Sequence, residues 1–232
     1  MNSTRRTAII VGVLFLAAYV GIFLGSTFYA PILDAPDYLV NVYPNKTRVI
    51  IGMLIELIND VAVIGIAVML YPILRKHSES IAIGYLGFRV IEAVILVVGK
   101  ISVLSLITLS QEYITAAAPD ASYFQAIGAS ALAERYWAGK MQAVFFILGA
   151  LILYYSLYQS KLVPRFVSVF GLIAVASLIT ANLLGVPDLT QGFQPVMILY
   201  FPIVLSELLL AIWLIVKGFN PSAIASQSIK QM

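Results

Sequence analysis

Residues 48–70 read RVIIGMLIELINDVAVIGIAVML, and this stretch decides the fold. It is long enough to supply the roughly 20 apolar helical residues that cross the hydrocarbon core of a bilayer. Its middle nevertheless carries Glu56 and Asp60. A charge near the bilayer centre costs roughly 2.5–3.5 kcal/mol on insertion scales, so it persists mainly where it is paired, hydrated or used. The stretch therefore predicts a membrane span that contains a candidate site.

The composition of the whole chain is typical of a membrane protein. Hydrophobic residues make up 61% of its 232 residues and charged residues 11%, and the mean hydropathy is +0.98. A soluble domain is usually about 45–50% apolar and about 25% charged. No linker-like segment divides the chain, so we expect one integral membrane domain over residues 1–232.

Residue content excludes several kinds of site. The chain has no cysteine and a single histidine, His77, which excludes disulfides, thiolate metal sites and a multi-histidine zinc site. The net charge is +3, but the basic residues are scattered at the ends of hydrophobic runs and form no stripe for nucleic acid. No cofactor fingerprint or catalytic triad surrounds the buried charges. We therefore predict no cofactor, no metal and no nucleic-acid partner.

Six hydrophobic runs remain when the chain is cut at its charged and proline-rich segments. They cover residues of about 7–29, 48–70, 81–109, 138–158, 164–184 and 195–216. Each approaches or exceeds the length that a spanning helix needs, so we predict an all-α polytopic bundle of six transmembrane helices. Arg5 and Arg6 precede the first run, whose length favours an uncleaved signal-anchor helix over a signal peptide.

Lysine and arginine are distributed unevenly over the two sides that these spans define. One side holds Arg5, Arg6, Arg75, Lys76, Lys161, Arg165, Lys217 and Lys230, whereas the other holds only Lys46, Arg48, Arg135 and Lys140. The positive-inside rule assigns the side with more basic residues to the cytoplasm. We therefore expect both termini to be cytoplasmic.

The outer connections contain a repeated dipeptide. Pro36-Asp37, Pro119-Asp120 and Pro187-Asp188 each lie between the two spans of one predicted hairpin. The interval from Asp37 to Glu56 recurs from the third dipeptide to Glu207. Three diverged helical hairpins would explain this recurrence. A general preference for Pro-Asp at helix starts, where Asp caps the first amide groups, would explain it as well, and both interpretations stay open.

Seven polar residues inside the predicted spans form the candidate site. They are Glu56, Asn59, Asp60, Arg89, Glu92, Lys100 and Glu207. Counted at 1.5 Å per residue from the span ends, Asp60, Arg89 and Glu207 fall roughly 18 Å below the outer boundary. Glu56 and Glu92 fall roughly 12–14 Å below it. These adjacent layers predict one buried polar centre among the second, third and sixth spans.

Two interpretations of this centre stay open. In the functional one, the four acids outnumber Arg89 and Lys100, which leaves a carboxyl to bind a proton, a cation or a small solute in ion- or proton-linked transport. In the structural one, Arg89 donates hydrogen bonds to two carboxylates and so fixes the helices in register. The protein is then a non-catalytic membrane assembly or stress-response partner. An intramembrane enzyme is less favoured, because the buried set lacks histidine.

Two further patterns predict local structure. Gly21 and Gly25 lie four residues apart and predict close packing of the first helix. A dimerisation face is their less favoured use, so a homo-oligomer is left open without support. Apolar residues at helical spacing over 123–132 predict that this outer loop carries a short helix of its own, which lies on the membrane or caps the bundle. A lid over a substrate cavity is the less favoured interpretation.

Four stretches give the chain a family resemblance. They are LGFRVIEA (86–93), APDASYF (118–124), YYSLY (154–158) leading to Pro164-Arg165, and VKGFNP (216–221). Together they resemble the prokaryotic membrane family called domain of unknown function 4386, over nearly the whole chain. The resemblance implies a six-span integral protein of a prokaryotic cell (plasma) membrane, in contact with the lipid bilayer and without an assigned activity. It implies no catalytic residues.

Overall fold

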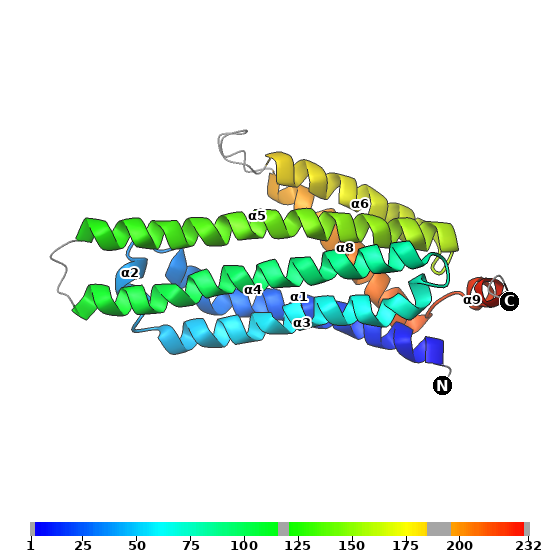
Figure 1. The fold of residues 1–232 in the computed structure, drawn as a ribbon, viewed down its shortest axis with the longest axis horizontal. Helices are drawn as coiled ribbons and strands as arrows, with labels where there is room; N and C mark the ends of the chain where they lie inside the picture. Colours follow the sequence, from blue (N-terminus) through cyan, green and yellow to red (C-terminus); the bar gives the residue numbers. More distant parts are fainter. Residues whose placement is uncertain (1–2, 116–120, 185–195, 230–232) are drawn as a thin grey trace. The chain divides into compact units, whose positions relative to one another are not determined.

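The computed structural model describes residues 3–115, 121–184 and 196–229 of the chain. Across these residues the backbone forms helices and no strands: α1 (Ser3–Leu33), α2 (Tyr38–Asn41), α3 (Lys46–Leu74), α4 (Glu79–Thr115), α5 (Ala121–Ser160), α6 (Arg165–Leu184), α8 (Val196–Val216) and α9 (Pro221–Ile229) (Figure 1). A helix pairs its backbone N–H and C=O groups within one segment, as hydrocarbon surroundings require. The all-α prediction is confirmed.

Among the described residues, six helices are long and apolar enough to cross a membrane. They are Ser3–Leu33, Lys46–Leu74, Glu79–Thr115, Ser122–Ser160, Arg165–Leu184 and Ile198–Val216. Each coincides with one of the six predicted hydrophobic runs, and several extend beyond it. The prediction of a polytopic bundle with six spans is therefore confirmed.

The fourth spanning helix is longer than the sequence predicted. α5 runs without a break from Ala121 to Ser160, so the separate helix predicted over residues 123–132 is instead the first part of α5. No proline interrupts this segment to remove a backbone donor. At 1.5 Å per residue, its 40 residues measure about 60 Å, twice the roughly 30 Å of a hydrocarbon core. Part of α5 therefore lies outside the hydrocarbon.

The described residues pack into two compact units. Unit 1 comprises Met1–Leu16, Ala62–Glu92 and Ala143–Met232, and unit 2 comprises Ala17–Val61 and Ala93–Gln142. Each unit has its own cluster of buried apolar side chains. α1, α3, α4 and α5 each contribute one part of their length to each unit. The expectation of a single domain over residues 1–232 stays a prediction.

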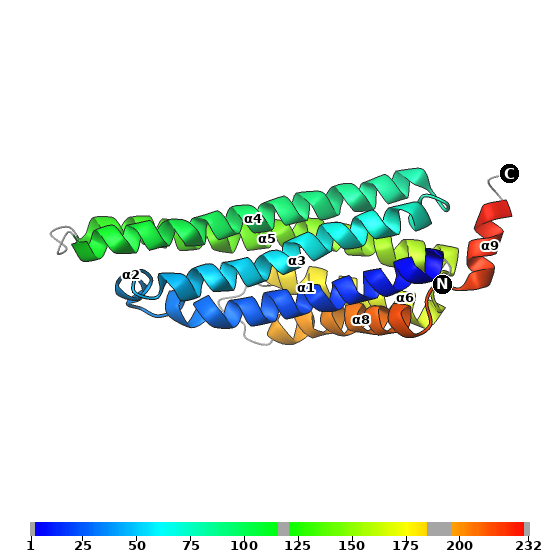
Figure 2. The same cartoon turned by 90° about the horizontal axis from the view of Figure 1, so that it is seen from below.

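The start of α1 and the end of α8 lie together in unit 1 (Figures 1 and 2). Arg5 donates hydrogen bonds to the carbonyls of residues 214, 215 and 216 at 2.5–3.2 Å. These are the last carbonyls of α8, which lack a partner within the helix. Arg5 therefore caps α8 in addition to any part that it plays in topology.

The VKGFNP stretch (216–221) forms the stop between α8 and α9. Gly218 has a φ of +78°, and its N–H donates to the carbonyl of Trp213 at 3.2 Å. A left-handed residue at this position ends a helix, and glycine adopts that conformation without Cβ strain. Asn220 Oδ1 then accepts the backbone N–H of Ser222 at 3.2 Å in the first turn of α9. This stretch thus has a structural role.

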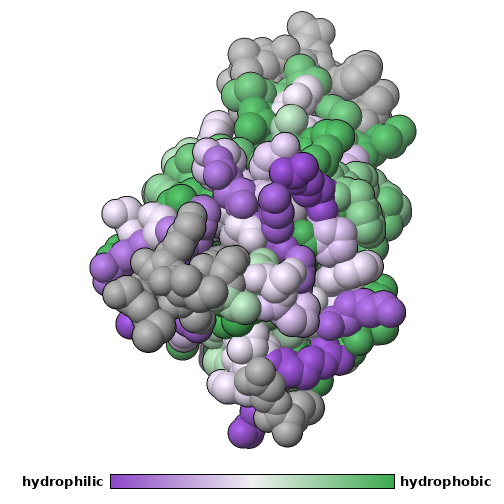
Figure 3. Space-filling model, turned by 90° about the vertical axis from the view of Figure 1, so that its right-hand side faces the viewer, coloured by the Kyte–Doolittle hydropathy of each residue, from purple (hydrophilic) through white to green (hydrophobic). Residues whose placement is uncertain are grey.

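Hydrophilic side chains gather at the end of unit 1 where these helices stop (Figure 3). The basic residues that follow or begin helices at this end are Arg6, Arg75, Lys76, Lys161, Arg165 and Lys217. The sequence predicted that these residues share one side of the protein, and their positions at one end of unit 1 agree with that. The side of the bilayer that this end faces stays a prediction.

Candidate functional site

Glycines bring α1 against the polar face of α3 in unit 2. A Cβ added at Gly25 would lie 2.7 Å from the carbonyl oxygen of Gly52 and 2.6 Å from Cγ of Glu56. One added at Gly21 would lie 2.9 Å from the backbone nitrogen of Asn59. Small residues permit such close approach of helix backbones in membranes. The close packing of the first helix predicted from Gly21 and Gly25 is confirmed, and it positions Glu56 beside α1.

Lys100 is the centre of a charged cluster in unit 2. Its ammonium lies 3.0 Å from Asp60 Oδ2 and 3.6 Å from Glu56 Oε2. It also donates to Asp60 Oδ1 at 3.1 Å, and Asn59 Nδ2 donates to the same oxygen at 3.3 Å. Lys100, Glu56 and Asp60 are 3–8% exposed. Two carboxylates of α3 therefore share one ammonium from α4. Sequence reasoning expected Arg89 at the level of Asp60, whereas the cation that contacts Asp60 is Lys100.

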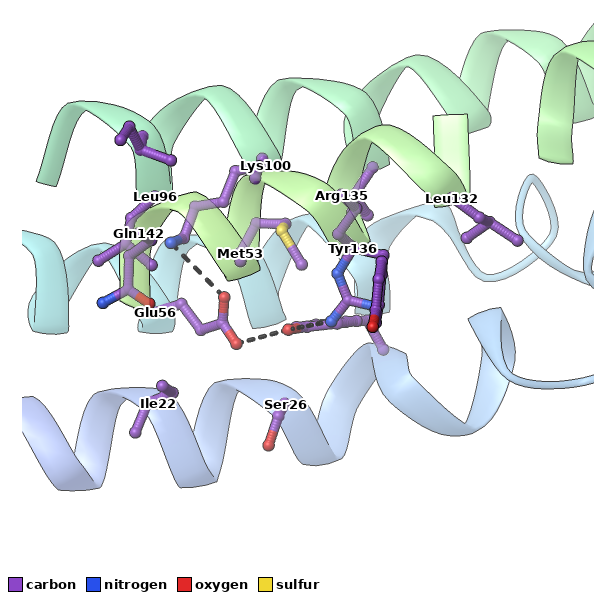
Figure 4. Close-up of a pocket in the computed structure, with 16 residues that line it drawn as sticks. Ile22, Ser26, Met53, Glu56, Leu96, Lys100, Leu132, Arg135, Tyr136 and Gln142 are labelled. Carbon is purple, nitrogen blue, oxygen red and sulfur yellow. Dashed lines mark hydrogen bonds and ion pairs between the residues drawn. The ribbon is translucent and has the colours of Figure 1, made fainter. Parts of the chain in front are cut away.

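A hydroxyl and a guanidinium extend this cluster to α1 and α5. Tyr29 donates to Glu56 Oε1 at 2.5 Å, and Arg135 Nη2 donates to the hydroxyl of Tyr29 at 2.9 Å. The guanidinium carbon of Arg135 also lies 4.9 Å from the centre of the Tyr29 ring. Contacts thus run from Arg135 through Tyr29 and Glu56 to Lys100. Figure 4 labels Arg135, Glu56 and Lys100 of this series. Four helices contribute to this chain of contacts.

Tyr29 and Arg135 were not among the residues predicted for the site. Arg135 lies among charges that sequence reasoning assigned to an outer loop, and Tyr29 lies at the end of an apolar run, where tyrosine is typical of the membrane interface. The signal that finds Arg135 is spacing. Leu132, Arg135, Gly139 and Gln142 recur at intervals of three and four residues, which places them on one helix face once α5 is known to be continuous.

These side chains border a cavity of about 500 Å³ in unit 2. Its wall combines apolar residues such as Met53 and Leu132 with the charged side chains of Glu56, Lys100 and Arg135 (Figure 4). Small-molecule sites usually occupy roughly 300–1,000 Å³ and combine a mainly apolar lining with a few placed polar groups. The cavity therefore has the size and lining needed to hold a small solute and to orient it by charge.

Arg89 and Glu92 form a second charged cluster, which lies in unit 1. Arg89 Nη1 donates to Glu92 Oε2 at 2.8 Å, one turn along α4. Both side chains are buried, and the guanidinium carbon lies 5.2 Å from the centre of the Phe146 ring. A Cβ added at Gly149 would lie 3.2 Å from Cδ of Arg89, so α5 passes close to the arginine. Packing from α5 encloses this pair.

Glu207 of α8 belongs to the same unit as this pair. It interacts electrostatically with Tyr85, Arg89 and Tyr154. Tyr154 donates to Ser206 Oγ at 3.1 Å. Tyr85 and Tyr154 are members of the apolar core of unit 1 and are at most 1% exposed. The charges of unit 1 are therefore set among tightly packed aromatic side chains.

The seven predicted site residues divide between the two units. Glu56, Asn59, Asp60 and Lys100 lie together in unit 2, whereas Arg89, Glu92 and Glu207 lie together in unit 1. Within the described ranges, no three His, Cys, Asp or Glu side chains gather closely enough to hold a metal ion.

The proposed hairpin repeat rests on dipeptides that the structure describes only in part. Pro119-Asp120 and Pro187-Asp188 lie outside the described residues. Asp37 precedes α2 and makes no side-chain capping hydrogen bond. The division into three diverged hairpins stays a prediction.

Comparison with known proteins places the chain in a family. No curated protein and no solved structure matches it. Residues 10–218, which include both charged clusters, match the family described as "Domain of unknown function (DUF4386)". This match confirms the resemblance expected from the four sequence stretches. The protein is a membrane-spanning chain that belongs to the family Domain of unknown function (DUF4386).

Proposed function

We propose that the protein binds a small solute in the cavity of unit 2 and carries it across the membrane, linked to an ion or a proton. The observation that carries this proposal is the cavity of about 500 Å³ to which α3, α4 and α5 each contribute one charged side chain. Charged residues within membrane spans are costly and commonly mark substrate and ion pathways. Solute binding gives these charges a role beyond packing.

The arrangement around Lys100 supports a link between the solute and an ion. Its ammonium lies 3.0 Å from Asp60 but 3.6 Å from Glu56, so Lys100 holds Glu56 less closely than Asp60. A proton or cation that binds Glu56 changes the charge that Lys100 has to balance. Because the same groups border the cavity, such a change alters the affinity for a charged solute. The coupling is then a free energy shared between two binding events.

We place the basic end of unit 1, and with it both termini, in the cytoplasm of a prokaryotic cell. The asymmetry of lysine and arginine supports this orientation. The chain has no native cysteine, so single cysteines report their side without background. In intact cells, an impermeant maleimide should label Lys46→Cys but not Lys161→Cys. The reverse pattern would overturn the orientation.

The rival function is that of a non-catalytic assembly or stress-response partner in the membrane. The pair of Arg89 and Glu92, buried one turn apart in unit 1, favours a structural role for that cluster. If both clusters are structural, filling the cavity should change neither binding nor transport.

Gly139 offers a test of the cavity. It lines the cavity, and a Cβ added there meets no other atom within 4 Å, so Gly139→Leu adds volume without an immediate clash. Gly87→Leu is the matched control, because a Cβ at Gly87 also meets nothing within 4 Å but that residue lies in unit 1. Both variants replace a helical glycine by the same apolar residue.

The measurement is uptake by proteoliposomes of labelled organic acids, amines and neutral solutes, with internal pH followed by a trapped dye. We expect Gly139→Leu to lower uptake of the transported solute by about tenfold or more, equivalent to about 1.4 kcal/mol. Gly87→Leu should match the parent. The proposal fails if the parent moves no solute faster than protein-free liposomes do, or if Gly139→Leu transports as the parent does.

A further inference from the structure

We infer that the solute of the unit 2 cavity is an organic anion with an apolar body, and that Arg135 binds its carboxylate or phosphate group. This inference rests on the proposed function, because it names the chemical class of the ligand in the same cavity. Three observations carry it: the charge of the wall, the hydrogen bonds of Arg135 and the apolar remainder of the lining.

The charges that reach the cavity wall do not balance. Lys100 and Arg135 line the cavity together with a single carboxylate, that of Glu56. That carboxylate already accepts a hydrogen bond from Tyr29 at 2.5 Å and lies 3.6 Å from the ammonium of Lys100. Asp60 pairs with Lys100 but does not line the cavity. Glu56 and Asp60 therefore offset the ammonium of Lys100, and the positive charge on the wall that no carboxylate of the described residues pairs with is that of Arg135.

Arg135 has hydrogen-bond donors to spare. A guanidinium carries five N–H donors, and with the residues that the structure describes Arg135 forms one hydrogen bond, from Nη2 to the hydroxyl of Tyr29 at 2.9 Å. Within the described part of the chain, it forms no salt bridge to a carboxylate. The Tyr29 ring, 4.9 Å from the guanidinium carbon, holds its position. A fixed guanidinium with unused donors matches the two oxygens of a carboxylate or phosphate.

The rest of the lining is apolar. Ile22, Met53, Ile95, Leu96, Val103 and Leu132 contribute to it. An inorganic anion would satisfy Arg135 but leave this surface bare, whereas an anion with an apolar body covers both parts of the wall. An ammonium group beside Arg135 is disfavoured by like-charge repulsion, because no carboxylate of the described residues pairs with that guanidinium.

Thermal unfolding in nanodiscs of zwitterionic phosphatidylcholine tests this assignment. The probes are dodecanoate, dodecylamine, acetate and inorganic phosphate, which separate the sign of the head group from the presence of a tail. A further arm uses nanodiscs that contain phosphatidylglycerol. It tests whether the anionic group that Arg135 binds comes from a lipid head group. We expect dodecanoate to raise the Tm by roughly 5 °C or more at about 100 times its Kd, and the other three soluble probes to leave it unchanged.

Variants of two arginines identify the binding group. Arg135→Gln should weaken the binding of dodecanoate about tenfold or more, because a hydrogen-bonded charge is lost from the site. Arg135→Lys should restore part of the affinity, since it keeps the charge but loses the planar fork. Arg48→Gln is the matched control, because Arg48 is an exposed cation of the same unit that does not line the cavity. It should bind dodecanoate as the parent does.

The outcomes separate this inference from the proposed function. If dodecylamine stabilises the protein and Gly139→Leu removes the effect, the cavity binds solutes but the anion assignment is wrong. If only phosphatidylglycerol gives a shift that depends on Arg135, the anion assignment holds and its source is a lipid head group. If inorganic phosphate or acetate raises the Tm as much as dodecanoate does, the inference that the solute has an apolar body is wrong. If neither Arg135→Gln nor Gly139→Leu changes the Tm shift produced by any probe, both the anion assignment and the proposed function are wrong.

Discussion

The two charged clusters use the same residue types in different surroundings. In unit 1, Arg89 pairs with Glu92 one turn away on its own helix, among packed aromatic side chains. In unit 2, Lys100 pairs with two carboxylates on another helix, beside a cavity. The comparison teaches that a buried charge in a membrane span is not by itself a sign of a binding site. What matters is the space beside the charge: Lys100 borders a cavity that a ligand could enter, whereas Arg89 is enclosed by packed side chains.

The largest effect expected from this comparison is the loss of Arg89. Arg89→Ala takes the guanidinium away from the buried carboxylate of Glu92 in unit 1, which should destabilise the protein by about 3–5 kcal/mol, the range for breaking a buried pair. The double variant Arg89→Met with Glu92→Leu should recover most of that loss, because it removes both charges at once. Chemical unfolding in detergent measures both. An Arg89→Ala variant that unfolds like the parent would contradict a structural role.

Loss of Lys100 should cost less. Lys100→Met takes the ammonium away from Glu56 and Asp60 in unit 2. Glu56 keeps the cavity beside it and Asp60 keeps the hydrogen bond from Asn59, so we expect about 1–3 kcal/mol. Adding Asp60→Asn should recover part of this loss, and a double-mutant cycle of unfolding free energies measures the coupling. A cost above that of Arg89→Ala would show that the unit 2 cluster, too, is mainly structural.

The sequence predicts the spans well because hydrocarbon leaves the backbone few alternatives. Runs such as 48–70 have to be helical, since each unsatisfied N–H or C=O is costly in lipid. The buried charges could be found for the same reason, because they stand out in apolar runs. Axial depth also follows from 1.5 Å per residue. These features depend on one helix at a time.

The partners of the charges could not be predicted in the same way. Which cation meets Asp60 depends on helix rotation and on neighbours, and these are fixed by contacts such as that of Gly25 with Gly52 rather than by depth. Arg135 was missed because hydropathy falls in the N-terminal part of α5 while the helix continues. Hydropathy reports the solvent around a segment, whereas helical continuity depends on its backbone hydrogen bonds.

Loss of the Tyr29 hydroxyl should have a smaller effect. Tyr29→Phe removes a hydrogen bond to Glu56 and the acceptor of Arg135, while it keeps the ring under the guanidinium. We expect a loss of about 1–2 kcal/mol, near the value for a hydrogen bond to a charged group. Tyr123→Phe is the control, because Tyr123 is 63% exposed. Equal denaturation midpoints for the two variants would remove Tyr29 from the cluster.

The smallest change in stability, and the sharpest test of the comparison, comes from replacing one acid in each unit by glutamine. Glu56→Gln keeps an oxygen that accepts from Tyr29, and Lys100 keeps Asp60, so the unfolding free energy should change by only about 1 kcal/mol. Glu207→Gln keeps the shape of a side chain in the other unit. The informative readout is function: the response of the Tm to added Na⁺ and K⁺, and the change of internal pH during solute uptake.

If the site lies in unit 2, Glu56→Gln should lose the ion or proton response while the protein stays folded, and Glu207→Gln should retain it. The reason is position, because Glu56 lines the cavity and Glu207 interacts with the packed group around Arg89. The opposite pattern would move the functional centre to unit 1, which holds Arg89, Glu92 and Glu207. Loss of the response in both variants would mean that the two clusters act as one centre, as the depths of their residues along the helices predict.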